Sequence, residues 1–324
     1  MATAVEYRPR VPGWRVVAAK ELADHLLSVR FAVLLVLLAL AAAGSVYAAA
    51  GEIRSVAEEA SGTPALFLRL FTESSGRLPS FLTLVGFLAP LLGIAFAFDS
   101  VNGERAQGTL PRLLAQPIHR DDVINGKFAA GLAVIALVLT SLTALIAGVG
   151  ILRLGVVPSF SQVVRLLVWL LVTIVYVGFW LGLATLCSIA MRRAATSALV
   201  AIAAWLVLAL FASLLVGLVA DAIAPVSADS PPQDIVRNRT IEQRLGRVSP
   251  AILYEEATVV LLNPTARTVG FLFLEQLDRA ILGSELSLEQ SLLLAWPQTV
   301  ALVALTLAVF AAAYVLFMRQ EIRA

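Results

Sequence analysis

The chain has 324 residues, of which 60% are hydrophobic and only 14% are charged, and its mean hydropathy is +0.89. Soluble globular domains carry roughly 45–50% apolar and about 25% charged residues, so this composition excludes a soluble protein and indicates an all-α membrane protein. The formal net charge of +2 is spread over several loops, which argues against nucleic-acid binding. Cys187 is the single cysteine, so no intramolecular disulfide can form, and two histidines offer no basis for a metal site.

Residues 14–29, WRVVAAKELADHLLSV, predict a helix that precedes the first membrane span. Apolar side chains recur at helical spacing on one stripe, from Trp14 to Val29, whereas Lys20 and other charged residues fall largely elsewhere. We therefore expect an amphipathic helix in the inner membrane interface, with the Trp14 ring at headgroup level. An ordinary solvated helix is the other interpretation of this pattern.

Six apolar runs are long enough to cross about 30 Å of hydrocarbon at about 1.5 Å per helical residue. Arg192 and Arg193 separate the fourth run from the fifth, which predicts a tight helical hairpin. The first run ends in a small-residue pattern that resembles a signal cleavage site, but this run and the polar segment before it are longer than in a standard signal. The predicted spans are residues 31–50, 81–99, 128–150, 166–190, 195–219 and 294–318.

Charges in the loops predict the orientation of these spans. The two terminal segments, the loop 100–127 and the turn at Arg192 carry more basic than acidic residues, whereas the segments 51–80 and 220–293 carry more acidic than basic ones. The positive-inside rule then predicts a multi-pass protein of the plasma (inner) membrane with both termini in the cytoplasm.

The extracytoplasmic segment 220–293 is expected to be helical. Ser249 as N-cap and Pro250 at the first helical position open a helix that Asn263 and Pro264 close. A second helix is expected over 267–282. Both are apolar on one face, so we expect them to lie against the outer membrane surface or a partner subunit.

No apolar run carries a charged or histidine side chain near its middle. A charge there costs about 2.5–3.5 kcal/mol, so it is kept mainly where ions or protons are handled. The chain also has no phosphate-binding GxxxxGK[ST] loop, and no His or carboxylate at membrane depth to activate a nucleophile. We therefore predict no catalytic residue and no directly bound cofactor, and expect the energy for any transport to come from outside the bilayer.

The stretch from Phe98 to Lys127 concentrates polar residues beside the membrane. Glu104 is expected to begin a short helix, Gly108 and Thr109 to end or re-cap it, and Leu110 to start an apolar face that continues to Pro117. Two interpretations stay open from these residues alone. One is a helix parallel to the membrane that docks into a groove on another protein, and the other is a solvated loop whose charges follow the positive-inside rule.

The order of residues in this stretch resembles the membrane permeases of type-2 ATP-binding-cassette (ABC) exporters, in particular the NosY-like branch. The match is dense, and the N-terminal KEL segment, the terminal FMRQEIR segment and the outer SPAILYEEA segment are also similar to that family. The residues that carry the resemblance in the stretch are Phe98, Asp99, Gly103, Glu104, Arg105, Gly108, Thr109, Leu110, Leu113, Leu114, Pro117, Ile118, Arg120, Val123, Gly126, Lys127 and Phe128.

The resemblance implies a single permease domain over 1–324 that pairs with a second permease copy as a homodimer in the lipid bilayer. Two copies of a separate ABC ATPase subunit would hold ATP and magnesium. Residues 14–29 would be an elbow helix, and the loop 100–127 would contain a coupling helix, 103–120, seated on the ATPase. The implied coupling residues are Asp99, Gly103, Glu104, Arg105, Gly108, Thr109, Leu110, Leu113, Pro117, Arg120 and Lys127, and those of the elbow helix are Trp14, Lys20, Glu21 and Arg30.

Two further functions stay open at this stage. A secondary transporter or channel would move its substrate without an ATPase, and a membrane scaffold would move none. The apolar and weakly polar spans loosely favour lipidic or amphipathic cargo, and the scarcity of Cys, Met and His argues against bare metal ions crossing by ligand exchange.

Overall fold

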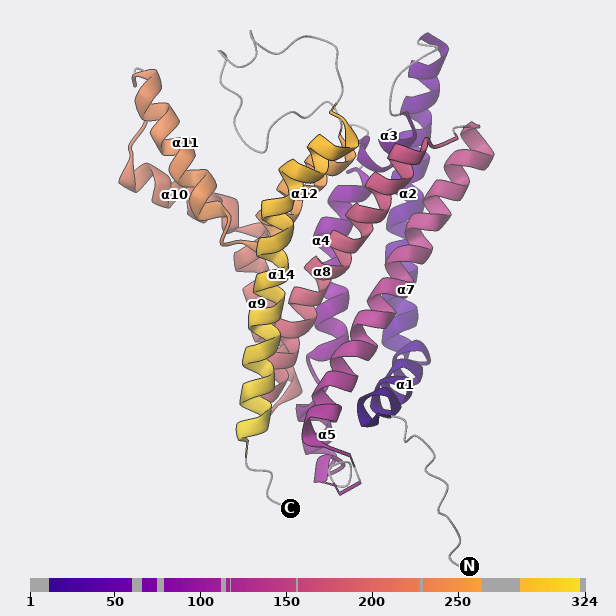
Figure 1. Ribbon diagram of the computed structural model, residues 1–324, viewed down its shortest axis with the longest axis vertical. Coiled ribbons are helices and arrows are strands. Elements are labelled where there is room, and N and C mark those ends of the chain that lie inside the picture. The colour runs from indigo at the N-terminus through magenta and orange to yellow at the C-terminus, as the bar shows by residue number, and fades with distance from the viewer. Residues whose placement is uncertain are drawn as a thin grey trace, which may run out of the picture.

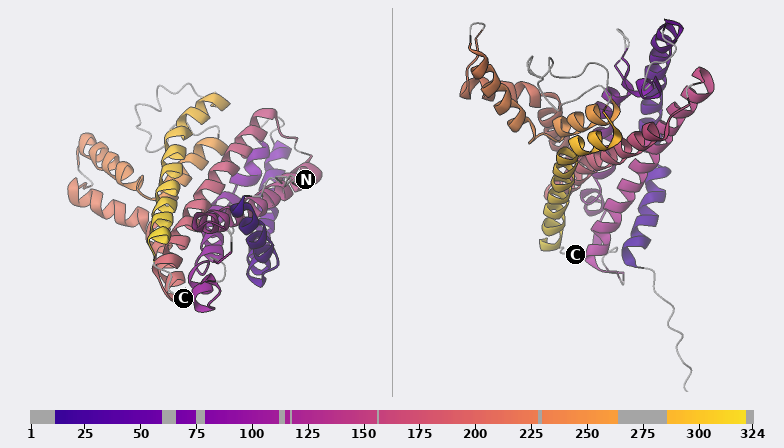
Figure 2. Two further views of the ribbon diagram at one scale, coloured as in Figure 1. Left: turned by 60° about the horizontal axis from the view of Figure 1, so that its bottom comes forward. Right: turned by 45° about the horizontal axis from the view of Figure 1, so that its top comes forward.

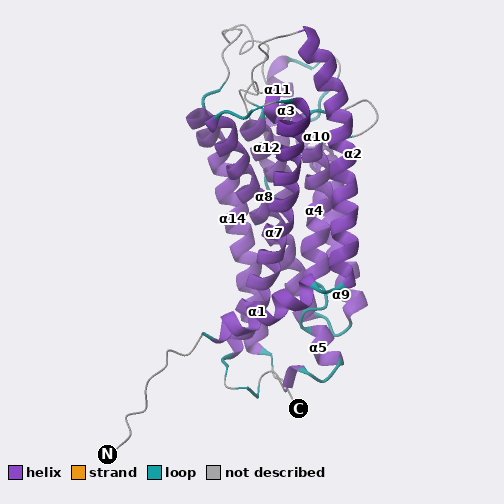
Figure 3. Ribbon diagram, turned by 90° about the vertical axis from the view of Figure 1, so that its right-hand side faces the viewer, coloured by secondary structure: helices purple, strands orange, loops and turns teal. Residues whose placement is uncertain are grey.

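The computed structural model describes residues 12–59, 66–74, 79–111, 115–116, 118–155, 157–227, 230–263 and 286–320. Every regular element within these ranges is helical, and most of the helices run side by side as one bundle (Figures 1 and 3). The first five are α1 (Gly13–Leu26), α2 (Val29–Glu59), α3 (Leu66–Thr72), α4 (Phe81–Ala97) and α5 (Asn102–Ala106). They are followed by α7 (Arg120–Leu154), α8 (Phe160–Ala190), α9 (Ala194–Trp205), η1 (Leu206–Leu210), α10 (Ala212–Ile223), α11 (Pro232–Gly246), α12 (Pro250–Leu262) and α14 (Leu288–Arg319).

Five helices, α2, α4, α7, α8 and α14, are long and apolar enough to cross a membrane. They correspond to the predicted first, second, third, fourth and sixth spans. Several extend beyond the predicted bounds: α7 begins at Arg120 rather than at 128, so the connection after α4 is shorter than the predicted loop 100–127. The helix α1 ends at Leu26, and Val29 already belongs to α2.

The predicted fifth span, 195–219, is not one straight helix. It consists of α9 continued by the π-helical segment η1 and then α10, which is bent by 57° from the segment before it. The hydroxyl of Ser249 donates a hydrogen bond to the Leu208 carbonyl, and the Phe211 amide donates to the Leu206 carbonyl, five residues back. The regular helical hydrogen bonding is therefore interrupted here, and the side chain of Ser249, which is distant in sequence, bonds the carbonyl of Leu208.

Beyond this bend, α10 and α11 form a hairpin that projects from the side of the bundle (Figures 1 and 2). The two helices pack mainly against each other. Asn238 of α11 donates to the Asp221 carboxylate and to the Ala224 carbonyl, both at 2.8 Å, which holds the hairpin closed. The sequence did not predict α11 as a separate helix, because its residues are mostly polar.

The core of the bundle is built around α8, which packs against α4, α7, α12 and α14. Trp169, Tyr176 and Trp180 on this helix are fully buried. The closest crossing is with α4 at Gly93: a Cβ atom placed there would lie 2.7 Å from the Val177 carbonyl oxygen of α8. Only a residue without a side chain lets the two backbones approach so closely.

The helix α12 begins as expected, with Ser249 accepting a hydrogen bond from the Ile252 amide. Its predicted position was wrong, however, because it packs on α8 and α14 and buries most of its side chains inside the bundle. The buried guanidinium of Arg165 in α8 fixes it there. It donates to the Leu261 carbonyl at 3.1 Å and to the Ser291 hydroxyl at 2.7 Å, and so joins the end of α12 to α14. The second helix expected over 267–282 lies outside the described residues.

Replacing Gly93 by Ala is expected to destabilise the bundle, since the added methyl group would meet the backbone of α8. Overpacking of this kind costs about 1–3 kcal/mol. The control is Gly148→Ala in α7, where a Cβ atom meets nothing within 4 Å and alanine favours the helix. Thermal unfolding of the detergent-purified proteins should show a lower midpoint for Gly93→Ala alone, and equal midpoints for the two variants would contradict the close crossing.

Candidate functional site

The predicted elbow and coupling residues gather at one end of the bundle. There α1 and α5 lie beside the end of α4, the start of α7 and the ends of α8 and α14 (Figure 1). We call this the α5 end. The polar side chains that the sequence distributes over more than 100 residues are thus brought into one region.

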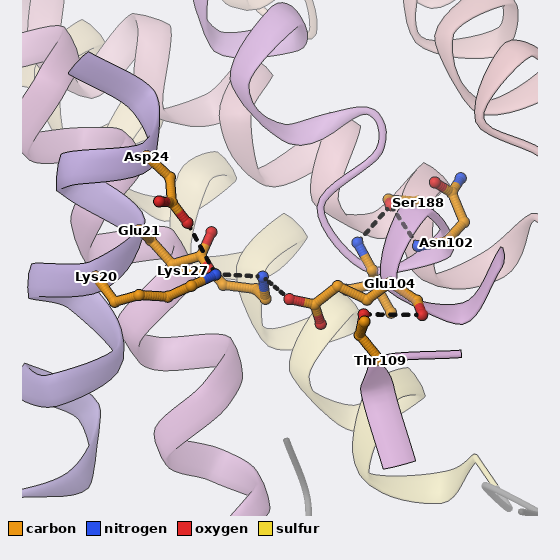
Figure 4. Close-up of polar contacts among 9 residues, drawn as sticks. Lys20, Glu21, Asp24, Asn102, Glu104, Thr109, Lys127 and Ser188 are labelled. Carbon is orange, nitrogen blue, oxygen red and sulfur yellow. Dashed lines mark hydrogen bonds and ion pairs between the residues drawn. The ribbon is translucent and has the colours of Figure 1, made fainter. Parts of the chain in front are cut away.

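A buried ammonium group joins three helices at the α5 end (Figure 4). Lys127 of α7 has a side chain that is only 6% exposed, and its Nζ lies 3.0 Å from Glu21 Oε1 of α1 and 2.8 Å from Glu104 Oε1 of α5. Lys20 extends the cluster toward the surface by pairing with Glu21 at 3.1 Å and with Asp24 at 2.9 Å. Each of the three helices therefore supplies a charge, and the ammonium group of α7 pairs with the carboxylates of the other two.

The electrostatics of Glu21 follow from this position. Burial by itself raises the pKa of the carboxyl group, but the charges of Lys127 and Lys20 and their hydrogen bonds more than offset it, so the pKa is lowered. Burial also lowers the pKa of His25, one turn further along α1, whose ring lies 5.0 Å from that of Phe96 in α4. At neutral pH Glu21 is therefore ionised and His25 is neutral.

The short helix α5 is held from its start by α8. The Ser188 hydroxyl oxygen accepts hydrogen bonds from the backbone amides of Val101 at 3.0 Å and Asn102 at 3.2 Å (Figure 4). These are donors that a helix leaves without partners in its first turn. In the sequence Ser188 sits in an apolar run, so nothing marked it as part of this site.

The other end of α5 is tied to the ends of α8 and α14. Arg105 donates to the Ile189 carbonyl at 3.4 Å, and Gln320 donates to the same carbonyl at 2.8 Å. Arg120 at the start of α7 donates in turn to the Gln320 carbonyl at 3.0 Å. The predicted residues Arg105 and Arg120 thus belong to one hydrogen-bonded chain that runs from α5 over the ends of α8 and α14 to α7.

Asp122 fastens α1, the predicted elbow helix, to α7. One carboxylate oxygen accepts from the Trp14 amide at 3.0 Å, at the start of α1, and the other accepts from the His119 amide at 3.1 Å, at the start of α7. A few residues on, a Cβ atom at Gly126 would lie 2.7 Å from the Val17 Cβ, so the two helices are in close contact. Asp122 was absent from the predicted set, although its place three residues after an N-cap position is a recognisable capping signal.

A second ion pair joins the first two membrane helices at the same end. Arg30 of α2 lies 2.6 Å from an Asp99 carboxylate oxygen just after α4, and its guanidinium covers the Phe98 ring at 5.0 Å. The side chain of Arg30 is 55% exposed, so this pair contributes little to stability and mainly orients the chain that leads into α5.

The remaining coupling residues separate into buried and exposed groups. Leu110, expected to present an apolar face, is fully buried in a small cluster with Ile124 and Phe317. The backbone from 106 to 109 forms an exposed tip, where Gly108 has φ +67° and the Thr109 amide and hydroxyl both donate to the Glu104 carbonyl. Gly103 lies within α5 beside Asp99. Leu113 and Pro117 lie outside the described residues.

The polar groups of the α5 end connect helices to one another. The described residues contain no group of three or more His, Cys, Asp or Glu side chains that could hold a metal ion. The arrangement joins a small exposed tip to four long helices.

The comparison with protein-family models decides the class of protein. The model described as "ABC-2 family transporter protein" matches residues 15–322. The chain belongs to this family. It is therefore an integral membrane protein of the ABC-2 transporter class, and the match includes the whole α5 end.

Two curated relatives of this ABC-2 family protein carry the same description. Over 124 residues, 37% of this chain and 39% of the relative, the chain is 32% identical to the probable ABC transporter permease protein NosY of Pseudomonas aeruginosa. Over 67 residues, 21% of this chain and 24% of the relative, it is 36% identical to the probable ABC transporter permease protein NosY of Stutzerimonas stutzeri. The matched stretches thus span well under half the length of either relative.

The Lys127→Met substitution should destabilise this ABC-2 protein strongly, because it leaves Glu21 and Glu104 as facing carboxylates with their shared partner removed. Breaking a buried ion pair from one side costs about 3–5 kcal/mol, whereas the matched change Lys20→Met, at a side chain 59% exposed, should cost less than about 1 kcal/mol. Thermal unfolding in detergent measures both. Adding Glu104→Gln to Lys127→Met should recover part of the loss, and strict additivity of the two changes would argue against the cluster.

The contribution of Glu21 should depend on pH in a defined direction. Its pKa is lowered from the ordinary value of 4.5, so the stability that it contributes is fully present above that value and is lost as pH falls through the depressed pKa of the folded state. The unfolding midpoint of the wild type should therefore exceed that of Glu21→Gln at pH 7, and the difference should shrink as the pH is lowered below about 4.5. If the difference between the two unfolding midpoints stays constant down to pH 3.5, Glu21 is not stabilised in its ionised form in the folded protein.

Proposed function

We propose that this chain is the permease subunit of an ATP-driven ABC exporter. It forms the translocation path with a second copy of itself, and two copies of a separate ATPase subunit drive it. The family match and the resemblance to NosY permeases support the class. The observation that carries the coupling role is the buried Lys127 cluster, which connects the small helix α5 rigidly to the elbow helix and to a long apolar helix.

The proposed orientation places the α5 end, both termini and the ATPase in the cytoplasm of the plasma (inner) membrane. Arg30, Arg105, Arg120, Arg192 and Arg193 all belong to segments at that end, which agrees with the positive-inside rule. ATP and magnesium would be held by the ATPase subunits, and this chain would contribute no catalytic group.

The exposed tip is the proposed ATPase contact. Residues 106–109 are exposed together with Gln116 and His119, whereas Lys127 and Leu110 are buried behind them. Arg105, Gly108, Thr109 and Arg120 would therefore meet the ATPase. Glu104, Leu110 and Lys127 would pass the displacement of the tip to the helices.

The proposed mechanism follows from these connections. Closure of the ATPase subunits would displace the tip, and α5 would move together with α1 and α7, because separating them leaves the Lys127 charge unpaired. The Ser188 hydroxyl would carry the same displacement into α8. The bundle would then shift between inward- and outward-facing arrangements, a two-state change biased from the cytosol.

Cross-linking from the exposed tip tests this proposal. The single cysteine is buried, so a Cys187→Ala background allows Gln107→Cys at the tip and Val157→Cys, 79% exposed in the connection between α7 and α8. We expect only Gln107→Cys to cross-link, in native membranes, to a protein that carries a GxxxxGK[ST] loop. We also expect a membrane-impermeant maleimide added to intact cells to label only Val157→Cys.

The complex purified through this chain should hydrolyse ATP and move cargo in proteoliposomes only when ATP is present. Labelling of Gln107→Cys from outside intact cells would reverse the orientation and end the coupling proposal. Uphill transport by the chain alone on an ion gradient would instead establish the secondary transporter, and an ATPase complex that moves no cargo would favour the scaffold.

A further inference from the structure

We propose that the outer end of this chain binds an amphipathic organic cation in a cavity between α4, α8, η1 and α12. The proposal deepens the proposed function, since it names the cargo class that the transporter would accept. It rests on the shape of the cavity, on its aromatic wall and on the position of one carboxylate.

The cavity lies at the end of the bundle opposite to α5. Its volume is about 450 Å³, within the usual range of small-molecule sites. The first turns of α4 and the middle of α12 form most of its lining, and Ala209 of the π-helical segment closes one side. The bend in the predicted fifth span therefore borders the cavity directly.

Two stacked aromatic rings form its inner wall. Tyr176 of α8 and Tyr254 of α12 lie with ring centroids 4.3 Å apart and planes inclined by 7°. The Tyr176 hydroxyl donates to the Gly86 carbonyl at 3.0 Å, and the Tyr254 hydroxyl lies 3.2 Å from the Thr173 hydroxyl. Because both rings are buried and both hydroxyl groups are engaged in the protein, the pair forms a fixed wall of the cavity.

Glu255 supplies the charge at this cavity. Its exposed side chain lines the cavity and forms no hydrogen bond or ion pair with the residues that the structure describes. The next residue, Glu256, differs: it accepts from Gln298 at 3.0 Å and pairs with Arg247 at 3.5 Å. One of two adjacent carboxylates is thus used to hold the fold, and the other faces the cavity without a cationic partner in the described ranges.

This combination selects for a cation with an apolar body. Among the described lining residues Glu255 is the only charged group, so an anionic ligand would meet repulsion and no compensating donor charge. A cation gains from the carboxylate and from the ring of Phe87, which is 42% exposed and lines the cavity. Apolar groups on the same molecule would fill the remaining volume beside Leu82 and Val259.

Equilibrium dialysis of the detergent-purified full chain tests the site with two probes of the same shape and opposite charge, each used alone. Tetraphenylphosphonium should bind saturably, and tetraphenylborate should show no saturable binding. Glu255→Gln should weaken tetraphenylphosphonium binding about tenfold, the equivalent of about 1.4 kcal/mol. Glu255→Asp should keep most of the affinity. Asp234→Asn, an equal charge change on the exposed face of α11, should leave it unchanged.

Three outcomes would overturn the cation site: no saturable tetraphenylphosphonium binding, equal binding of the two ions, or unchanged affinity in Glu255→Gln. Because Glu255 is exposed and makes no hydrogen bond or ion pair in the described ranges, its amide variant should fold, and an unchanged unfolding midpoint checks this. The dialysis uses no ATPase. A failed cross-link at Gln107 would therefore count against the coupling role alone, and failed dialysis would count against the cargo class alone.

Discussion

The rest of this structure depends on one buried positive charge. An ammonium group taken out of water is stable only when carboxylates meet it at close range, and Lys127 obtains these from two other helices, through Glu21 and Glu104. Apolar packing can slide by small steps, but this cluster cannot separate without leaving a charge unpaired. The helices α1, α5 and α7 are consequently held together as one unit.

That constraint divides the polar stretch after α4 into two layers. The inner layer holds α5 through Lys127 and through the Ser188 hydroxyl, and the outer layer is an exposed tip around Gly108. A resemblance to a family marks both layers equally, because it compares residue types and not the positions of the side chains. Only the positions of the side chains separate them, as the burial of Leu110 illustrates.

The sequence predicted most of the spans because a run of about twenty apolar residues has few stable structures other than a membrane-spanning helix. It predicted the start of α12 because Ser249 and Pro250 form a local cap. It failed where a distant residue decides the local structure. The break after η1 depends on the same Ser249, 41 positions from Leu208, and the burial of α12 depends on Arg165. Asp122 could have been found from its capping position, whereas Ser188 had no signal in a run of apolar residues.

One helix, α8, contacts both the α5 end and the outer cavity. The helix α8 is unbroken from Phe160 to Ala190, and it carries Ser188 against α5 and Tyr176 in the wall of the outer cavity. Twelve residues of helix separate them, about 18 Å at about 1.5 Å per residue. A displacement of α5 that moves Ser188 would therefore also move Tyr176, while Ala209 on the other side of the cavity lies in a π-helical segment next to a 57° bend. One wall of the cavity thus belongs to a continuous helix, and another lies at a break in helical hydrogen bonding. Motion at the α5 end would then change the width of the cavity. In the proposed exporter, this is how ATP-driven closure would alter the affinity for cargo.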